Sequence, residues 1–203
     1  MLLIQCDFDD TITVGNVSSS IRTKFAPKKW LEMEKEYYAG LYSVEESNIR
    51  QYAMFQIGRK EIEEHVRKHV TIRKGFANFI EHCQRIGVRV TVVSSGLDIY
   101  IRPTMRRLGL EQMEVYSGKA QVSPSGIHVK YTDPSGKPLS SGFKEAYLSH
   151  FKESGYTVIY IGDGLSDIVP ATKSDFTIAR SQLKRHFETN NLPHYPYYTF
   201  TEV

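Results

Sequence analysis

Cysteine and tryptophan are scarce in this sequence: its 203 residues include two cysteines, Cys6 and Cys83, and one tryptophan. Two widely separated cysteines form no disulfide framework of the kind that stabilises small secreted proteins, and a reducing interior suits them. The first residues contain no basic segment before the acid at Asp7. We therefore expect no secretory signal peptide and a cytoplasmic location.

Long hydrophobic runs and an excess of one charge are also absent. No apolar stretch approaches the roughly 20 residues that a membrane-spanning helix needs, so we expect no membrane partner. Lysine and arginine number 26 against 23 aspartates and glutamates, a formal net charge of +3. This balance is not typical of a nucleic-acid-binding protein, although it would not repel a small anionic substrate.

Three short, nearly unbroken apolar runs are present instead, at 2–4, 88–93 and 157–161. Such runs predict strands that are buried on both faces of a parallel sheet. Helical patterns precede the second and third runs, at 75–86 and 144–152. The alternation predicts an α/β fold, a doubly wound parallel sheet with right-handed crossovers. Ligands of such sheets bind at the carboxyl ends of the strands.

One long segment departs from this alternation. Between residues 14 and 73 the sequence shows helical patterns only, including a capping box at 43–46 that begins a helix expected to run through Phe55. We predict that residues 14–73 form a helical cap domain, inserted into a core formed by residues 1–13 and 74–203. The sequence does not decide whether four tyrosines of this cap lie in its core or line a substrate pocket: Tyr37, Tyr38, Tyr42 and Tyr52.

Two later segments have strand-like patterns. The stretch "EVYSGKAQVSPSGIHVKYTDPSGKP" alternates polar and apolar residues around Ser125-Gly126, which predicts a small β-hairpin followed by an exposed loop. The aromatic end "LPHYPYYTF" predicts a final strand at an edge of the sheet.

Polar and acidic residues cluster where the three predicted strands end. Asp7–Asp10 follows the first strand, Ser94–Gly96 the second and Gly162–Asp167 the third, while Lys144 begins the preceding helix. Three like charges within four positions cost free energy unless a cation or a chemical task uses them. A calcium-binding EF-hand loop is excluded, because neither acidic cluster has glycine at the sixth position and glutamate at the twelfth.

These elements resemble, in their order, the four motifs of the haloacid dehalogenase superfamily, in its phosphoserine-phosphatase-like subfamily. The stretches that carry the resemblance are "CDFDDTIT", "VVSSG", Lys144 and "GDGLSD", and it covers nearly the whole chain. The resemblance implies a Rossmann-like core with a helical cap. It also implies a Mg²⁺-dependent phosphatase that hydrolyses a small phosphorylated metabolite through a phosphoaspartyl intermediate.

The resemblance assigns a role to each motif residue. Asp7 would be the nucleophile, and Asp9 would protonate the leaving oxygen and then activate the water that hydrolyses the intermediate. Mg²⁺ would be held by Asp7, the backbone carbonyl of Asp9 and Asp163, with Asp167 supporting it directly or through water. The phosphate would be bound by four residues: Ser94, Ser95, Gly96 and Lys144.

The motifs also depart from the subfamily pattern. Asp10 stands where relatives often carry glycine, a departure that an exposed turn would tolerate, and Ser166 stands where phosphoserine phosphatases usually carry asparagine. Those phosphatases also carry a cap glutamate soon after the first motif, whereas "VGNVSSSI" contains no acid.

The motifs, together with "SDFTIARSQL" and the aromatic end, are more similar to the methionine-salvage phosphatases, which act on 2-hydroxy-3-keto-5-methylthiopentenyl-1-phosphate. Phosphoserine, phosphocholine and phosphoethanolamine stay open as substrates. A phosphomutase and a non-catalytic binding module stay open as functions outside hydrolysis, and the sequence gives no oligomeric state.

Overall fold

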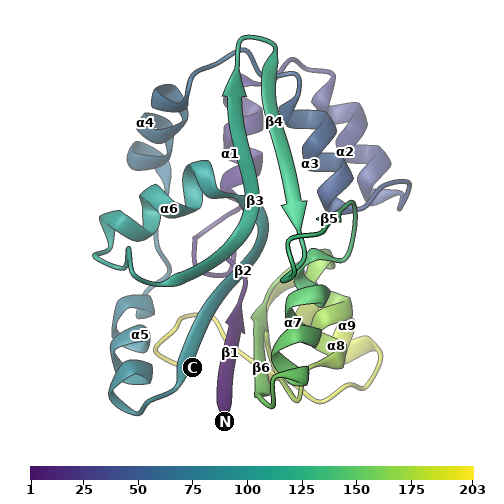
Figure 1. Cartoon of the computed structure of the whole chain (residues 1–203). Helices are drawn as coiled ribbons and strands as arrows, with labels where there is room; N and C mark the ends of the chain where they lie inside the picture. Colours follow the sequence, from purple (N-terminus) through teal and green to yellow (C-terminus); the bar gives the residue numbers. More distant parts are fainter.

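Eight strands form one sheet with the order β5-β4-β3-β2-β1-β6-β7-β8 (Figure 1). The structure, a computed structural model, describes all 203 residues. The strands are β1 (Leu2–Cys6), β2 (Arg89–Leu97), β3 (Glu114–Ser123), β4 (Gly126–Thr132), β5 (Pro138–Leu139), β6 (Thr157–Gly162), β7 (Phe176–Ala179) and β8 (Tyr195–Pro196).

β1 lies at the centre of the sheet, between β2 and β6. It pairs in parallel with both, so that Cys6 lies opposite Val92 on one side and Ile161 on the other. The carboxyl ends of the three strands therefore meet at one edge of the sheet. The strand order also reverses beside β1, which is where doubly wound sheets bind their ligands. The predicted doubly wound α/β fold is confirmed.

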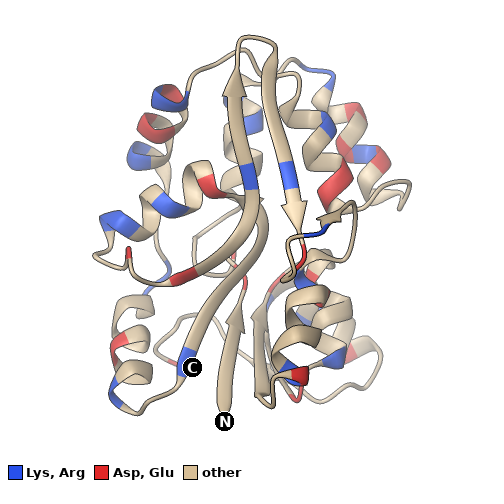
Figure 2. Ribbon diagram, in the orientation of Figure 1, with Lys and Arg blue, Asp and Glu red and all other residues tan.

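Helices cover the central strands on both sides. Figure 1 shows α5 on one side of the sheet and α7 and α8 on the other, and basic and acidic residues are interspersed over the helices (Figure 2). No helix is long and apolar enough to cross a membrane. The helices after residue 73 are α5 (Phe76–Arg85), α6 (Asp98–Arg107), α7 (Phe143–Glu153), α8 (Ile168–Lys173) and α9 (Ser181–Thr189).

The segment from 14 to 73 is helical, as expected. It contains α1 (Val17–Phe25), α2 (Trp30–Tyr38), α3 (Val44–Tyr52) and α4 (Arg59–His69) in succession. The capping box at Ser43 and Glu46 is present at the start of α3. The helix ends at Tyr52, however, and Phe55 lies beyond it, where its ring stacks on that of Tyr52 at 4.8 Å. The division into a cap domain and a core stays a prediction.

β3 has two roles along its length. Its first half, Glu114–Ser117, pairs in parallel with β2, and its second half pairs antiparallel with β4. The hairpin is therefore confirmed, but it continues a strand of the main sheet that the sequence patterns did not reveal. The segment expected to be an exposed loop contains β5, which pairs with β4.

The hairpin also packs against α3, which lies beside β4 in Figure 1. The turn of the hairpin packs against the end of α3 so closely that a Cβ on Gly126 would lie 2.2 Å from the carbonyl oxygen of Ala53. At the opposite edge of the sheet, the predicted final strand is confirmed as β8, which pairs with β7 over two residues. Tyr197 and Phe200, which follow β8, are buried.

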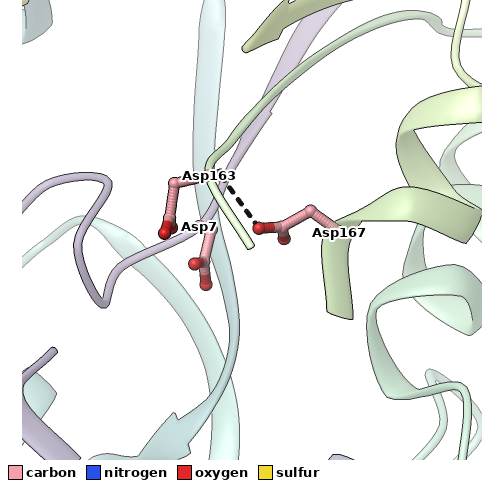
Figure 3. Close-up of side chains that lie close together, drawn as sticks. All are labelled: Asp7, Asp163 and Asp167. Atoms are coloured by element: carbon pink, nitrogen blue, oxygen red, sulfur yellow. Dashed lines mark hydrogen bonds between the residues drawn. The ribbon is translucent and has the colours of Figure 1, made fainter. Parts of the chain in front are cut away.

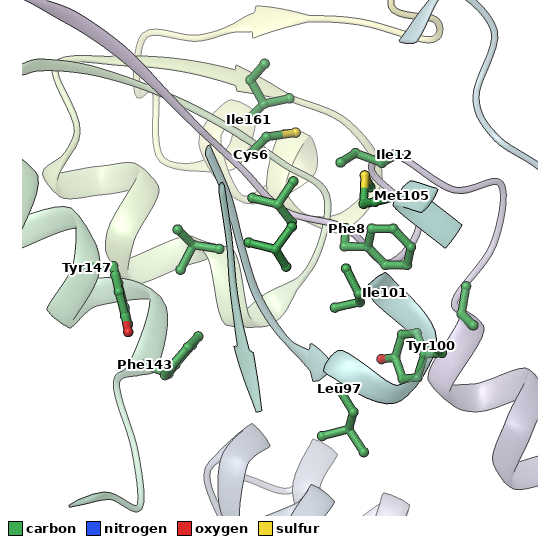
Figure 4. Packing of buried hydrophobic residues seen from close by; sticks show 14 of the residues in the cluster. Cys6, Phe8, Ile12, Leu97, Tyr100, Ile101, Met105, Phe143, Tyr147 and Ile161 are labelled. Atoms are coloured by element: carbon green, nitrogen blue, oxygen red, sulfur yellow. The ribbon is translucent and has the colours of Figure 1, made fainter. Parts of the chain in front are cut away.

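The hydrophobic core reaches directly beneath the first acidic motif. Phe8 and Ile12 are fully buried and pack in one cluster with Leu97, Tyr100 and Ile101 from the end of β2 and the start of α6 (Figure 4). Burying a side chain of this size contributes about 1.5 to 3 kcal/mol. The apolar residues that alternate with Asp7 and Asp9 thus fix the backbone that carries these aspartates.

Candidate active site

The motif residues meet at the carboxyl edge of the sheet. Asp7 follows β1 and its backbone N–H donates to the carbonyl of Ile161 at 2.9 Å. Ser94–Gly96 lies at the end of β2, and Asp163 follows β6. These residues, with Lys144 from the first turn of α7, line one cavity of about 310 Å³. The structure thus brings together all four predicted elements.

Lys144 is buried between two carboxylates. Its Nζ lies 2.8 Å from Asp7 Oδ1 and 2.6 Å from Asp167 Oδ1, and it also donates to Ser166 Oγ at 3.1 Å. Burial alone would lower the pKa of Lys144, but Asp167 and Asp7 outweigh it and raise this pKa above its ordinary value. Lys144 is therefore a fixed cation beside Asp7.

Asp7, Asp163 and Asp167 form an acidic cluster in which one oxygen of each lies within 4.8 Å of the others (Figure 3). Burial raises the pKa of Asp7 to about 7, although Lys144 opposes the rise. Burial, with the charges of Asp167 and Asp7, also raises the pKa of Asp163 well above its usual range. Such crowding of hard oxygen donors fits a site for Mg²⁺, whose charge would relieve the repulsion.

Asp167 is already saturated by donors of the protein. Its Oδ1 accepts from Lys144 and from the Tyr160 hydroxyl, each at 2.6 Å. Its Oδ2 accepts from the backbone N–H groups of Asp163 at 3.0 Å and Gly164 at 2.8 Å. A carboxylate offers about four acceptor positions, and all four are in use. Asp167 therefore fixes Lys144 and the loop after β6, which leaves Asp7 and Asp163 better suited to contact a metal ion.

Asp9 lines the cavity next to Asp7, and both of its carboxylate oxygens are held. The backbone N–H of Val17 donates to Oδ1 at 2.8 Å, and the hydroxyl of Tyr100 donates to Oδ2 at 2.7 Å. Burial raises the pKa of Asp9, while the hydrogen bonds from Tyr100 and Val17 oppose the rise. Tyr100 was not identified from the sequence, because a tyrosine in an amphipathic helix looks like any core aromatic.

The hydroxyl groups of Ser94 and Ser95 have different hydrogen-bond partners. Ser94 lines the cavity and its Oγ accepts from the backbone N–H of Gly96 at 3.1 Å. Ser95 instead donates its hydroxyl to Glu45 of α3 at 3.1 Å, and its carbonyl accepts from Asn48 at 2.8 Å. The hydroxyl and the carbonyl of Ser95 are therefore both engaged by α3. Nothing in the sequence pattern singles out Glu45 or Asn48.

Asp10 adopts a left-handed backbone conformation with φ of 52°. This conformation explains the glycine that relatives often carry here, because glycine reaches it without strain. The expectation of an exposed turn is wrong: Asp10 is half-buried and forms ion pairs with Arg73 at 3.2 Å and Arg180 at 2.9 Å. Arg73 also donates to the carbonyls of Thr11 and Thr13, each at 2.8 Å, and so holds the loop in shape.

The wall of the cavity opposite the aspartates comes from α1, α2 and α3. Tyr37 and Tyr38 line it, whereas Tyr52 is fully buried and Tyr42 lies under the guanidinium of Arg50. Of the four tyrosines that the sequence left unassigned, Tyr37 and Tyr38 therefore line the cavity, and Tyr42 and Tyr52 do not.

The same wall contains a charged pair that sequence reasoning missed. Arg22 of α1 lies 3.5 Å from Glu34 of α2, and both line the cavity. An acid is therefore present near the site, although it comes from α2 and not from the segment directly after the first motif. Arg22 also donates to Ser18 at 3.1 Å and to Asn48 at 3.2 Å, so it ties α1 to α3.

Comparison with known sequences identifies the group to which these motifs belong. A family model for haloacid dehalogenase-like hydrolases matches residues 4–169. A 2-hydroxy-3-keto-5-methylthiopentenyl-1-phosphate phosphatase of Brevibacillus brevis is 28% identical over 206 residues, which cover 100% of this chain and 93% of that protein. The phosphatase of the same name from Geobacillus kaustophilus is 28% identical over 207 residues, with 100% and 93% covered.

Solved structures give the same fold. A phosphoserine phosphatase carrying an analogue of its phospho-aspartyl intermediate superposes with a TM-score of 0.69 at 19% identity, covering 98% of this chain and 94% of that one. A substrate-bound phosphoserine phosphatase superposes with a TM-score of 0.68 at 20% identity, covering 91% and 89%. At these identities the likeness concerns the fold.

Proposed function

Since the chain belongs to the haloacid dehalogenase-like hydrolase family and is a phosphoric monoester hydrolase, we propose that it cleaves a small phosphate monoester through a phosphoaspartyl intermediate on Asp7. One observation carries this proposal. Asp7 lies at the edge of the sheet, with the buried cation Lys144 Nζ 2.8 Å from its carboxylate. Ser94–Gly96, the predicted phosphate-binding residues (the phosphate motif), line the same cavity. A carboxylate so placed can meet a phosphate whose charge is neutralised from the same side.

The proposed reaction has two displacements. The Asp7 carboxylate attacks phosphorus, the bond to the leaving oxygen breaks, and Asp9 gives that oxygen its proton. The Asp9 carboxylate then takes a proton from a water molecule, which attacks phosphorus, releases inorganic phosphate and restores Asp7. Lys144 and the Ser94–Gly96 backbone stabilise the phosphoryl oxygens throughout.

A magnesium ion completes this site. Asp7, Asp163 and the backbone carbonyl of Asp9 would hold it, and its charge would offset the repulsion between the nucleophile and the phosphate. The fit rests on the acidic cluster, in which Asp7 and Asp167 are buried and three carboxylates face the single cation of Lys144. Asp167 acts through Lys144 and, at most, through water.

We propose 2-hydroxy-3-keto-5-methylthiopentenyl-1-phosphate as the substrate. The relatives from Brevibacillus brevis and Geobacillus kaustophilus, which align with the whole chain, carry this activity in their names. The cavity wall also supports it. Tyr37, Tyr38 and Val44 offer apolar and aromatic surface, which suits a thioether chain.

Phosphoserine is the second candidate, and one observation favours it. Arg22 and Glu34 present a guanidinium and a carboxylate side by side in the cavity wall, which complements the carboxylate and the ammonium group of an amino acid. The two side chains already pair with each other at 3.5 Å, so an amino acid would have to compete with this contact. Phosphocholine and phosphoethanolamine would use Glu34 and the tyrosine rings only.

Phosphate release from a panel of monoesters with Mg²⁺ tests both the proposed reaction and the proposed substrate. The panel contains the methylthiopentenyl phosphate, phosphoserine, phosphocholine and phosphoethanolamine. We expect turnover that disappears in EDTA and falls at least about a thousandfold in Asp7→Asn, because that variant lacks the nucleophile. A higher kcat/KM for phosphoserine would overturn the substrate but not the reaction. Folded, inert protein that binds the esters would favour a binding module, and phosphate returned to the product would favour a mutase.

A further inference from the structure

We propose that Tyr100 is a positioning residue that orients the carboxyl group of Asp9 for proton transfer, an inference that rests on the proposed function. Tyr100 lies in α6, is fully buried and is not part of the cavity lining. Its hydroxyl donates to Asp9 Oδ2 at 2.7 Å. Tyr100 therefore cannot touch the substrate and acts through Asp9.

The carboxyl group of Asp9 is held from two sides. Val17, the first residue of α1, donates its N–H to Oδ1, and Tyr100 donates its hydroxyl to Oδ2. A carboxylate with donors on both oxygens no longer rotates freely about its terminal bond, and these hydrogen bonds leave acceptor positions on it. Since Asp9 lines the cavity, those positions are available for exchanging a proton with the leaving oxygen and with water.

The surroundings of Tyr100 indicate that the hydroxyl is present for Asp9. The ring packs among apolar side chains, with the ring of Phe8 at 6.1 Å and Ile101 in the same cluster (Figure 4). A phenylalanine ring would fill this space equally well, and a buried hydroxyl costs free energy unless it has a partner. In this structure its one hydrogen-bond partner is Asp9.

Gly96 leaves the space in which this hydrogen bond forms. A Cβ atom on residue 96 would lie 2.3 Å from the Tyr100 hydroxyl and 2.8 Å from Asp9 Oδ2. Neither atom could keep its position against such a contact. The absence of a side chain at Gly96 thus has a second role besides letting a phosphate approach the backbone. It lets Tyr100 of α6 come within hydrogen-bond distance of Asp9.

The dependence of the rate on the leaving group tests this role. An alkyl phosphate needs its leaving oxygen protonated, whereas p-nitrophenyl phosphate releases a stable phenolate and needs the acid much less. We compare kcat/KM, which reports formation of the phosphoaspartate and excludes its later hydrolysis. In Tyr100→Phe we expect kcat/KM to fall about 10- to 100-fold for the best alkyl ester of the panel (phosphoserine, phosphocholine or phosphoethanolamine) and less than about threefold for p-nitrophenyl phosphate.

Tyr52→Phe is the matched control, because Tyr52 is also fully buried and its hydroxyl bonds to the hydroxyl of Ser18 at 2.8 Å and not to Asp9. It should change kcat/KM for the two substrates by the same factor. Tyr100→Met also lacks the hydroxyl, so its kcat/KM should fall more for the alkyl ester than for p-nitrophenyl phosphate, as in Tyr100→Phe. This second variant keeps the test valid if Tyr100→Phe fails to fold.

A second measurement does not depend on activity. Urea unfolding in metal-free buffer is measured for the wild type, Tyr100→Phe, Asp9→Ala and the double variant. The free energies of unfolding should be non-additive, by a coupling that corresponds to about tenfold or more in the unfolding constant, as a hydrogen bond to a charged group predicts. Parallel loss on both substrates, or additive free energies of unfolding, would overturn the role of Tyr100. A wild type that hydrolyses no monoester would instead overturn the proposed function, and the role of Tyr100 with it.

Discussion

At the scale of single residues, Lys144 decides whether the acidic site is stable in the folded chain. It is the cation that contacts Asp7 and Asp167, and all three side chains are buried. Two carboxylates buried side by side without a cation would repel each other and lose their hydration. The same lysine that stabilises the proposed phosphoryl transfer thus also stabilises the fold around the site.

Lys144→Met is expected to lower the free energy of unfolding by roughly 3 to 5 kcal/mol in EDTA, because it leaves buried charges unpaired. Mg²⁺ should restore part of this loss, since an ion that binds only the folded state stabilises it by mass action. Urea denaturation with EDTA and with Mg²⁺ measures both effects. Lys152→Met is the control on the same helix: its exposed pair with Asp175 should contribute less than about 1 kcal/mol. Equal losses in the two variants would contradict this argument.

A site residue could be predicted from the sequence when the topology of the sheet places it, and not when the packing of a helix places it. Asp7, Ser94, Lys144 and Asp163 follow predicted strands or begin a predicted helix, so their meeting at one edge follows from the topology of a parallel sheet. Tyr100 lies 91 positions from Asp9. Its hydrogen bond depends on how α6 packs, and a buried tyrosine in a helical pattern gives no sign of it.

At the scale of secondary structure elements, α3 is the helix that connects the cavity wall to Ser94–Gly96. Glu45 accepts from the hydroxyl of Ser95 at 3.1 Å and from the N–H of Phe143, next to Lys144, at 3.3 Å. Asn48 donates to the Ser95 carbonyl at 2.8 Å. One helix from the segment 14–73 therefore fixes two of the four motifs.

Glu45→Gln tests this connection through the pH dependence of stability. Burial raises the pKa of Glu45, so the folded protein holds its proton more tightly than the unfolded chain does. The contribution of Glu45 to stability is therefore present below the ordinary glutamate pKa and is lost as the pH rises through the raised pKa. The free energy of unfolding of Glu45→Gln relative to wild type should increase from acidic to neutral pH. Urea denaturation across this range measures it, with the exposed Glu61→Gln as control; a pH-independent difference would refute it.

The elements themselves were predictable where the pattern is long or fully buried. β1, β2 and β6 are apolar runs in the centre of the sheet, and the capping box marks the start of α3. β7 was not predicted, because four residues with an exposed phenylalanine at position 176 carry little pattern. The parallel half of β3 was missed because its alternation continues without a break into the hairpin.

At the scale of the whole molecule, the site lies between the edge of the sheet and the helices of the segment 14–73. The edge of the sheet supplies the aspartates and Lys144, and α1, α2 and α3 supply the opposite wall of a cavity of about 310 Å³. We propose that residues 14–73 act as a cap that selects the substrate by size and shape. A cavity of this volume is at the lower end of those that hold small ligands.

The enclosure predicts discrimination against large phosphate esters. A phosphoseryl peptide of about ten residues would have to displace the wall formed by α1 to α3, including the contacts of Glu45 and Asn48 with Ser95, before its phosphate reached Asp7. Losing two or three such hydrogen bonds, at about 1 kcal/mol each, lowers kcat/KM by roughly 30- to 160-fold. Phosphate release measured side by side should therefore show the peptide at least about thirtyfold below the best small monoester. If the peptide were cleaved within tenfold of it, the wall would have to open freely, and residues 14–73 would not select the substrate by size.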